Sequence, residues 1–238
     1  MLDFRGKTVI VTGSTGNLGA AVAQRFVDHS ANLVLTDRGT NRLKQSFPNL
    51  FDSDQHMLAD GVDVTNPDSV SGLIDKVLGR FNHIDVLINT VGGFRAGTTL
   101  AETPITTLDF MHNINTRSVF VTSQAVLPYM TKEKKGKIVN VSARAGLRGD
   151  AKMSAYSASK ATVIRLTESM SAEVKNLGIN INCILPGTID TPQNRKAMPE
   201  AKYEYWVKPE SLADVIVFLA SDYARDIHGA AIPVYGNS

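Results

Sequence analysis

Two side chains in the segment SAYSASKAT are suited to proton transfer: the phenol of Tyr156 and the ammonium of Lys160. Their spacing of i and i+4, at the start of a predicted helix, places both on one helix face. A free phenol has a pKa of about 10, too high for ready proton exchange at neutral pH. An ammonium held beside it favours the phenolate and lowers that pKa. The pair therefore predicts general acid–base catalysis, although Tyr and Lys also meet on helix surfaces by chance.

A glycine-rich turn near the N-terminus is suited to binding phosphate groups. The stretch TGSTGNLG (residues 12–19) follows the apolar run KTVIVT and precedes the helical pattern AAVAQRFVDH. Such a turn lets backbone approach a pyrophosphate, and the helix N-terminus supplies unpaired N–H groups and a positive dipole. Glycines also serve tight turns that bind nothing, so the turn alone is weak evidence. The residues predicted to contact the ligand here are Gly13, Thr15, Gly16, Asn17, Leu18 and Gly19.

Two acids and an arginine follow the turn in the order expected of a dinucleotide site. Asp37 ends the second apolar run, about 20 residues after the turn, where a carboxylate accepts hydrogen bonds from an adenosine ribose. Asp63 and Val64 follow the third run, at the rim where an adenine would lie. Arg38 favours a 2′-phosphate instead, which the carboxylate of Asp37 would repel. We therefore predict NAD as the cofactor, with NADP as the alternative that Arg38 leaves open.

Composition and charge exclude several classes of function. The 238 residues carry a net charge of +2 and are 43% hydrophobic, as expected of a globular protein with a sizeable core. Lys and Arg are scattered, so no nucleic-acid partner is expected. The single cysteine, Cys183, lies in the apolar run INCILP and is expected to be buried, and no CxxC or HExxH motif predicts a metal. No segment approaches the ~20 apolar residues of a membrane span, and a cytoplasmic protein is expected.

The elements that must position these residues alternate between strand-length apolar runs and longer helical patterns. The runs lack polar alternation, as do strands of a parallel sheet that is covered on both faces. The predicted strands are KTVIVT, NLVLT, HMLADGV, DVLIN, GKIVNVS, INCILP and AAIPVYG, and the predicted helices cover residues 17–30, 40–47, 67–81, 104–130, 155–177 and 209–221. The predicted fold class is α/β: a single-domain, doubly wound, Rossmann-like parallel sheet over residues 1–238, with about seven strands and helices on both faces.

Together these motifs resemble the short-chain dehydrogenase/reductase family. The resemblance covers nearly the whole chain and rests on TGSTGNLG, Asp63-Val64, NTVG (residues 89–92), Asn115, YSASK and PGTIDT (residues 186–191), in this order. The combination is specific, whereas each motif alone is not. The resemblance implies an NAD(P)-dependent oxidoreductase that passes a hydride between nicotinamide and a small carbonyl or alcohol substrate.

The resemblance also implies roles for individual residues. Tyr156 would be the acid/base, while Lys160 would hold the nicotinamide ribose and lower the pKa of Tyr156. Asn115 would help to anchor a proton-relay water, and residues 188–191 would enclose the carboxamide. Further cofactor contacts are implied for residues after the fourth and sixth strands, namely Asn89, Gly92, Pro186, Gly187, Ile189 and Thr191.

Two positions depart from the family pattern. The shorter members usually have a glycine where this chain has Asn17, but Asn tolerates left-handed backbone and is a credible substitute. The family also places a serine at the end of the fifth strand, where this chain has Ala143, with Ser142 one place earlier. Adjacent strand residues point to opposite faces, so Ser142 reaches the site only if the strand end bulges. We predict that Ser142 takes part in catalysis, with a structural role as the alternative.

Three functions remain compatible with the sequence, and a dehydrogenase or reductase leads. The second, motivated by Ala143, is a dinucleotide-binding sensor or scaffold with weak or lost turnover, which the intact Tyr156 and Lys160 pair opposes. The third, an epimerase or dehydratase of the longer branch, is motivated only by the GxxGxxG spelling of the turn and opposed by the chain length. The irregular segment 188–208 predicts a lid over the substrate, whose identity stays open.

A homo-oligomer is predicted from the apolar helical pattern SLADVIVFLAS (residues 211–221). One apolar stripe is complete at helical spacing, and Val217 and Phe218 belong to a second. A helix that flanks a single domain needs only one buried stripe, and the last strand is expected beside it at the sheet edge. We therefore predict a tetramer or dimer with Val217 or Phe218 at a subunit contact, unless segment 188–208 of the same chain covers this face.

Overall fold

The apolar runs of the sequence form a central parallel sheet whose strands are mostly buried on both faces. The computed structural model describes residues 2–237, and its strand order is β3-β2-β1-β4-β5-β6-β7. The strands are β1 (Thr8–Thr12), β2 (Asn32–Asp37), β3 (His56–Asp60), β4 (Val86–Asn89), β5 (Gly136–Val141), β6 (Ile179–Pro186) and β7 (Ala231–Val234). The order reverses between β1 and β4, the place where such sheets bind ligands beyond their strand ends. The predicted Rossmann-like fold is confirmed.

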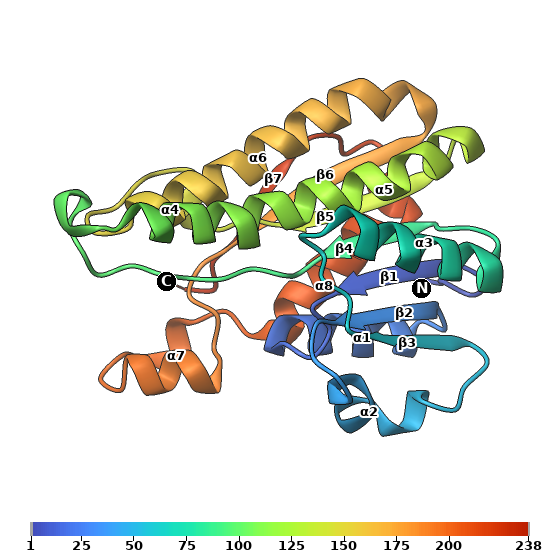
Figure 1. Cartoon of the computed structure of the whole chain (residues 1–238), viewed down its shortest axis with the longest axis horizontal. Coiled ribbons are helices and arrows are strands. Elements are labelled where there is room, and N and C mark those ends of the chain that lie inside the picture. Colours follow the sequence, from blue (N-terminus) through green and yellow to red (C-terminus); the bar gives the residue numbers. More distant parts are fainter. Residues whose placement is uncertain (1, 238) are drawn as a thin grey trace.

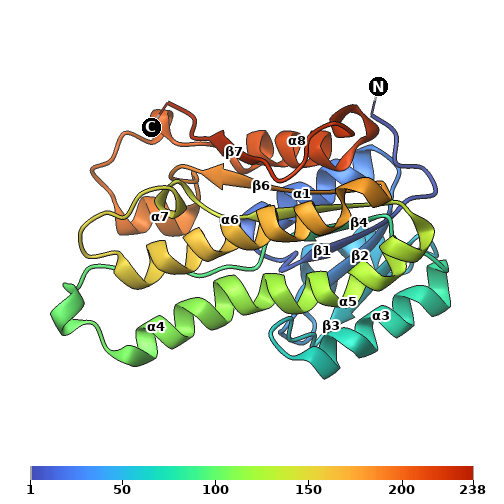
Figure 2. The same cartoon turned by 90° about the horizontal axis from the view of Figure 1, so that it is seen from above.

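Helices cover both faces of the sheet (Figures 1 and 2). One face is covered by α1 (Asn17–Asp28) and α8 (Pro209–Ala220), and the other by α3 (Pro67–Phe81), α5 (Ser118–Glu133) and α6 (Ser154–Val174). A hydrophobic cluster that contains Phe26 and Leu35 lies under the first pair, and one that contains Ile10 and Ile138 lies under the second group. The sheet is therefore held by a core on each side. Three shorter helices are α2 (Arg42–Ser46), α4 (Ile105–Met111) and α7 (Pro192–Ala197).

The predicted helix over residues 104–130 is one helical path with a change of pitch. α4 continues into a π-helical segment, His112–Arg117, and then into α5, which extends to Glu133. No Gly or Pro in HNINTR announces this segment, so the sequence pattern gave no signal for it. π-Helical turns inside helices are frequent at functional sites. Other boundaries differ by a few residues: α6 ends at Val174, and β6 begins at Ile179.

α8 buries only part of its second apolar stripe within the chain. α1 packs along α8, and an ion pair of 2.6 Å between Nε of Arg25 and Oδ1 of Asp214 joins the two helices. Val217 is only 1% exposed as a result, so the prediction that it lies at a subunit contact is wrong. Phe218 stays 41% exposed. β7 lies at the edge of the sheet, as predicted.

Among residues 2–237, no helix combines the length and apolar character needed to cross a bilayer. Within the same range, no group of three or more His, Cys, Asp and Glu side chains is placed to hold a metal ion. Cys183 is fully buried in β6.

Candidate active site

The glycine turn lies between β1 and α1 and forms a cradle of backbone. Gly13 has a φ of +63°, and a Cβ at this position would lie 2.8 Å from Cγ2 of Val91. A Cβ at Gly19 would overlap the carbonyl of Gly13, so the turn and the helix touch directly. Gly16 is the N-cap of α1, and no side chain caps this helix end. The N–H groups of the first turn therefore remain available to a phosphate, and the turn fits a dinucleotide.

Asp37 is held as a fixed carboxylate beside this turn. It is 7% exposed, and its Oδ1 accepts a hydrogen bond of 2.7 Å from the backbone N–H of Gly39. The hydroxyl of Thr15 donates to its Oδ2, and the guanidinium of Arg42 lies 3.4 Å from Oδ1. Arg38 is exposed and has no ion pair within the described part of the chain. A bound adenosine ribose would therefore meet the carboxylate as a rigid group and Arg38 as a movable one.

Asp63 and Val64 lie at the rim beyond β3 but contribute differently. Oδ1 of Asp63 accepts hydrogen bonds from the backbone N–H of Thr65, at 2.9 Å, and from its hydroxyl, at 2.7 Å. These bonds hold the pKa of the Asp63 carboxyl below its usual value. The Val64 side chain is 5% exposed and belongs to the core, as does Leu18 of the glycine turn. Val64 and Leu18 therefore face a ligand with their backbone only.

Asn89, predicted to contact the cofactor, uses its side chain inside the protein. Its Nδ2 donates to Oδ1 of Asn140 at 2.9 Å, and its Oδ1 accepts from the hydroxyl of Thr122 at 2.8 Å. Asn140 in turn donates to Oγ1 of Thr167 at 3.0 Å. These four buried residues form a polar ladder from α5 across β4 and β5 to α6. Only the backbone of Asn89 therefore remains for a cofactor contact. The pairing of its side chain with Asn140 and Thr122 cannot be recognised from strand spacing alone.

Tyr156 and Lys160 project from the first turns of α6 toward the end of β5 and the loop after β4. The ammonium of Lys160 is buried and donates to the carbonyl of Val141 at 2.9 Å. A Cβ at Gly92 would lie 3.2 Å from Nζ of Lys160, so only glycine allows this approach without displacement. The ring of Tyr156 meets the ring of Phe94 edge to face, with 4.8 Å between centroids. The structure therefore brings Gly92, Tyr156 and Lys160 together, as predicted.

Burial dominates the titration of this pair. Burial raises the pKa of Tyr156 to about 12 and lowers the pKa of Lys160 to about 8. The shift at Tyr156 is opposite to the lowering predicted from the sequence. The physical reason is that desolvation penalises the phenolate, while the Lys160 ammonium donates to the Val141 carbonyl rather than to the phenol. Tyr156 is therefore a protonated phenol at neutral pH in this structure.

Asn115 lies in the π-helical segment and fixes the loop after β4. Its Oδ1 accepts from the N–H of Gly93 at 2.8 Å, and its Nδ2 donates to the carbonyl of Gly93 at 3.1 Å. A second bond from Nδ2 reaches Oγ of Ser159 on α6 at 3.0 Å. The side chain thus holds the loop and α6 together beside Tyr156 and Lys160. The predicted contact with a relay water stays a prediction.

Ser142 is turned toward α6 and is 2% exposed. Its hydroxyl donates to the carbonyl of Lys160 at 2.7 Å, and a Cβ at Gly146 would lie 2.9 Å from its Oγ. The hydroxyl proton is therefore used within the protein, which argues against the predicted part in catalysis and favours the structural alternative. Ala143 follows with extended backbone, at φ −164° and ψ 161°, without the bulge that would redirect Ser142.

Segment 188–208 follows β6 and forms a loop whose two ends are hydrogen-bonded to each other. The N–H of Asp190 donates to the carbonyl of Val207 at 2.8 Å, and the N–H of Val207 donates to the carbonyl of Thr188 at 3.0 Å. Within it, Thr191 caps α7 through a hydrogen bond of 3.2 Å from the N–H of Asn194. The residues predicted to enclose the cofactor, which are Pro186, Gly187, Ile189 and Thr191, lie at or near its fixed base.

Asn17 links this segment to the glycine turn. Its Nδ2 donates to Oε1 of Gln193 on α7 at 2.8 Å. Asn17 is also the first residue of α1, with right-handed helical backbone, so the left-handed tolerance expected of it is not used. The pattern-breaking residue of the turn therefore contacts the predicted lid.

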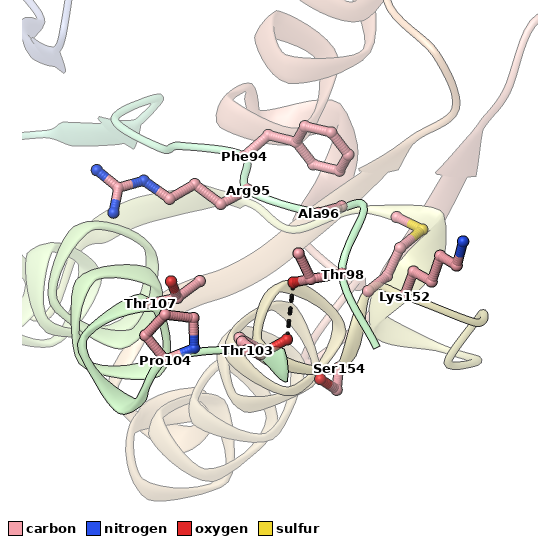
Figure 3. Close-up of a pocket in the computed structure, with 11 residues that line it drawn as sticks. Phe94, Arg95, Ala96, Thr98, Thr103, Pro104, Thr107, Lys152 and Ser154 are labelled. Atoms are coloured by element: carbon pink, nitrogen blue, oxygen red, sulfur yellow. Dashed lines mark hydrogen bonds between the residues drawn. The ribbon is translucent and has the colours of Figure 1, made fainter. Parts of the chain in front are cut away.

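A cavity of about 440 Å³ lies beside Tyr156, between the loop after β4 and the start of α6 (Figure 3). Phe94 forms one wall and Ala155 another. Sequence reasoning placed the substrate contacts in segment 188–208 and missed this loop. The sequence signal that could have located this loop was the aromatic residue Phe94 shortly after NTVG. In the structure the Phe94 side chain is 63% exposed.

Comparison with known proteins identifies the family. A profile of the family described as short chain dehydrogenase matches residues 7–202. The chain is 32% identical to a 3-oxoacyl-acyl-carrier-protein reductase of Thermotoga maritima, over 99% of this chain and 98% of that protein. It is 29% identical to a hydroxy(phenyl)methylsuccinyl-CoA dehydrogenase subunit of Thauera aromatica, over 99% and 97%. The solved structure of ElxO with NADP bound superposes with a TM-score of 0.89 at 29% identity, over 97% of both chains.

The site and these comparisons agree. The glycine cradle and the pair of Tyr156 and Lys160 lie beyond the carboxyl ends of the central strands. The strand order of this sheet matches a Rossmann-like fold. The family match covers most of the chain, including both motifs. The protein therefore belongs to the short chain dehydrogenase family of oxidoreductases.

Proposed function

We propose that the protein is an NAD-dependent oxidoreductase that transfers a hydride between nicotinamide and a small carbonyl or alcohol substrate, with Tyr156 as the acid/base. The observation that supports this best is that Tyr156 packs on Phe94 and buried Lys160 lies against Gly92, beyond the carboxyl ends of the central strands, where the glycine cradle also lies. A nicotinamide dinucleotide, when bound, supplies the hydride donor or acceptor.

The residues of this chain bind, orient and move a proton. The glycine turn and the N-terminus of α1 hold the pyrophosphate, and Asp37 accepts from the adenosine ribose. Lys160, fixed by Val141, is available to a nicotinamide ribose beside Tyr156. The Tyr156 phenol, which is protonated at neutral pH, donates its proton to the substrate oxygen in carbonyl reduction, and its phenolate accepts the proton in alcohol oxidation.

Turnover measurements test the proposed reaction. Consumption of NADH and NADPH is followed with a panel of ketones and aldehydes. In the reverse direction, reduction of NAD⁺ and NADP⁺ is followed with the corresponding alcohols. We expect steady-state turnover with at least one member of the panel. The second candidate, a sensor motivated by Ala143, predicts tight cofactor binding measured by calorimetry and no turnover with any member of the panel.

We propose NAD as the preferred cofactor because the rigid carboxylate of Asp37 would repel a 2′-phosphate. The measurement is the ratio of kcat/KM for NADH and NADPH with one substrate. Asp37→Ala should lower kcat/KM for NADH and so reduce the preference for NADH over NADPH. A preference for NADPH of about tenfold, or 1.4 kcal/mol, would make Arg38 the dominant residue and overturn this assignment.

We also propose a homo-oligomer, a tetramer ahead of a dimer, in the cytoplasm. The support for assembly is the exposed ring of Phe218 on α8 together with the edge strand β7. The support for the compartment is the lone, free and fully buried Cys183, which fits a reducing environment.

A further inference from the structure

We propose that Phe94 is a positioning residue, whose ring holds the phenol of Tyr156 in the direction of the substrate oxygen. This inference rests on the proposed function, because it concerns the residue that would exchange the proton. Phe94 follows the NTVG segment and belongs to none of the motifs in the sequence.

The direction of the Tyr156 phenol is not fixed by hydrogen bonds. Within the described part of the chain, no group donates to its hydroxyl or accepts from it. Lys160 donates to the carbonyl of Val141 instead, and Ser142 donates to the carbonyl of Lys160. α6 fixes the backbone of Tyr156, but the side-chain torsions that aim the phenol are set by packing. The orientation of the phenol therefore depends on what packs against its ring.

The ring of Phe94 supplies this packing. It meets the ring of Tyr156 edge to face, with 4.8 Å between the centroids and 83° between the ring planes. Such pairs, at centroid distances of about 4.5 to 7 Å, are favourable beyond the apolar area that they bury. Figure 3 shows the Phe94 ring projecting from the loop after β4 in a direction different from that of the Arg95 side chain. The contact restricts rotation of the Tyr156 side chain and so limits the directions that the phenol can take.

The backbone of Phe94 is itself anchored on both sides. On one side, the N–H of Gly93 donates to Oδ1 of Asn115 at 2.8 Å, and its carbonyl accepts from Nδ2 of Asn115 at 3.1 Å. On the other side, the N–H of Gly97 donates to the carbonyl of Lys152 at 2.9 Å, in the segment that leads into α6. These bonds tie the loop after β4 to the π-helical segment and to the start of α6. The Phe94 ring is therefore held in place relative to α6, the helix that carries the phenol.

Phe94 contributes little to the fold. Its side chain is 63% exposed, and it belongs to none of the hydrophobic clusters that hold the sheet and helices of the described chain together. Exposed side chains outside a core are usually replaced with little change in stability. A ring that packs on Tyr156 without supporting the core is thus placed to serve the reaction, and its removal tests this role without unfolding the protein.

Steady-state kinetics of carbonyl reduction test the proposal with three variants. Phe94→Ala should lower kcat by about tenfold or more and change KM little, because a phenol that is free to turn away reaches the substrate oxygen less often. Phe94→Tyr keeps the ring, and its added hydroxyl can face solvent, so it should retain most of the wild-type kcat. The matched control is Phe120→Ala, which removes a 49% exposed ring from α5 and should leave both constants unchanged.

A double-mutant cycle with Tyr156→Phe shows whether Phe94 acts through the phenol. Tyr156→Phe keeps the ring contact and removes the hydroxyl that Phe94 would position. If Phe94 acts through that hydroxyl, adding Phe94→Ala to Tyr156→Phe should not lower the residual kcat further. Losses of kcat that multiply in the double variant would assign Phe94 to direct contact with the substrate and overturn the proposal. A loss in Phe94→Ala that is confined to KM would overturn it as well.

An NMR experiment without substrate keeps the inference separate from the proposed function. Relaxation of ¹³C-labelled tyrosine rings measures the mobility of each ring, and the Tyr156 signals are identified by their loss in Tyr156→Phe. We expect the Tyr156 ring to become more mobile in Phe94→Ala and to stay as ordered as in the wild type in Phe94→Tyr and Phe120→Ala. A Tyr156 ring that is no more mobile in Phe94→Ala than in the wild type would overturn this inference alone. Absence of turnover with every carbonyl compound, together with a mobile Tyr156 ring in Phe94→Ala, would count against the proposed function alone.

Discussion

Lys160 combines a buried ammonium with a main-chain acceptor, and this arrangement is costly in stability. Its side chain is 5% exposed, and burial lowers its pKa from 10.5 to about 8. The folded state therefore binds the proton more weakly than the unfolded state. At neutral pH both states are protonated, and the shift corresponds to a loss of on the order of 3 kcal/mol in the free energy of unfolding. A residue retained under such a penalty is expected to serve the reaction rather than the fold.

The first prediction follows from this penalty. Lys160→Met should raise the free energy of unfolding at pH 7 by about 2 kcal/mol, because the penalty outweighs the lost hydrogen bond to Val141. The unfolded wild type binds more protons between pH of about 8 and 10.5, so wild-type stability rises across this window and the gain should shrink there. Denaturant unfolding without cofactor measures both. Lys175→Met, at an exposed position, is the control. A gain in the free energy of unfolding of Lys160→Met that does not change with pH would contradict the lowered pKa of Lys160.

The second prediction concerns position 143, where this chain has Ala143 and therefore no side-chain hydroxyl. Ala143→Ser should raise kcat, because it adds a hydroxyl donor just beyond the end of β5, whereas the hydroxyl of Ser142 already donates to the carbonyl of Lys160. Ser142→Ala should leave kcat and cofactor affinity nearly unchanged. Steady-state kinetics with a single ketone compares the two variants. A large fall of kcat in Ser142→Ala, with no effect of Ala143→Ser, would restore Ser142 as the residue that polarises the carbonyl.

The residue scale also shows the limit of sequence patterns. The spacing of Tyr156 and Lys160 predicted their shared face, because helix geometry fixes it. The roles of Asn89 and Ser142 were not predictable, because each depends on a partner from a distant part of the chain, such as Asn140 or the carbonyl of Lys160. The same holds for the Tyr156 pKa, since spacing indicates a nearby charge but not the burial that outweighs it.

At the scale of elements, segment 188–208 has a fixed base and a single polar link to the cofactor cradle. The base is formed by main-chain bonds between residues near Thr188 and Val207, and the link runs from Asn17 to Gln193 on α7. This link connects the part of the chain predicted to cover the substrate with the turn that fits the pyrophosphate. Cofactor binding and lid position are therefore expected to depend on each other.

The third prediction tests this link. Gln193→Ala removes the acceptor for Asn17 and should raise the KM for the cofactor by a few fold, on the order of 1 kcal/mol for one exposed hydrogen bond, while kcat changes little. Lys196→Ala, an exposed change on the same short helix, is the matched control. Cofactor KM values measured at saturating ketone give the comparison. Equal effects of the two variants would show that α7 acts only through its general surface.

The elements themselves were largely predictable because their physical causes are local. Strands buried on both faces need continuous apolar residues, so all seven strands were visible as runs. The π-helical segment His112–Arg117 was not visible, because no helix-breaking residue marks it, and the bond between Asn115 and Gly93 within it is a contact between distant parts of the chain. The burial of Val217 was missed because the packing of α1 on α8 is a tertiary contact.

At the scale of the whole molecule, the surface of α8 and the edge of the sheet are the features on which the proposed assembly rests. Phe218 is 41% exposed on a helix whose other large apolar residues are mostly buried, and β7 leaves one edge of its backbone unpaired by another strand. A twofold axis near this edge would let the same surface meet itself. The exposed aromatic ring would then lie at a subunit contact.

The fourth prediction is the consequence for assembly. Light scattering at micromolar concentration should give a multiple of the 25.7 kDa chain mass, and Phe218→Asp should shift it toward the monomer. Phe51→Asp, at a similarly exposed ring near β3, is the control and should leave the mass unchanged. A monodisperse monomer of the wild type would contradict the proposal, as would an oligomer that Phe218→Asp leaves intact.

Tyr156→Phe is the most direct test of the account, because it removes one hydroxyl and keeps the ring that contacts Phe94. The measurement pairs kcat for carbonyl reduction with cofactor affinity from calorimetry, for the wild type and the variant. The account predicts that kcat falls by about 10²–10⁴-fold while cofactor affinity stays close to the wild-type value. A variant that binds the cofactor and retains near wild-type kcat would contradict the central claim that Tyr156 exchanges the proton with the substrate oxygen.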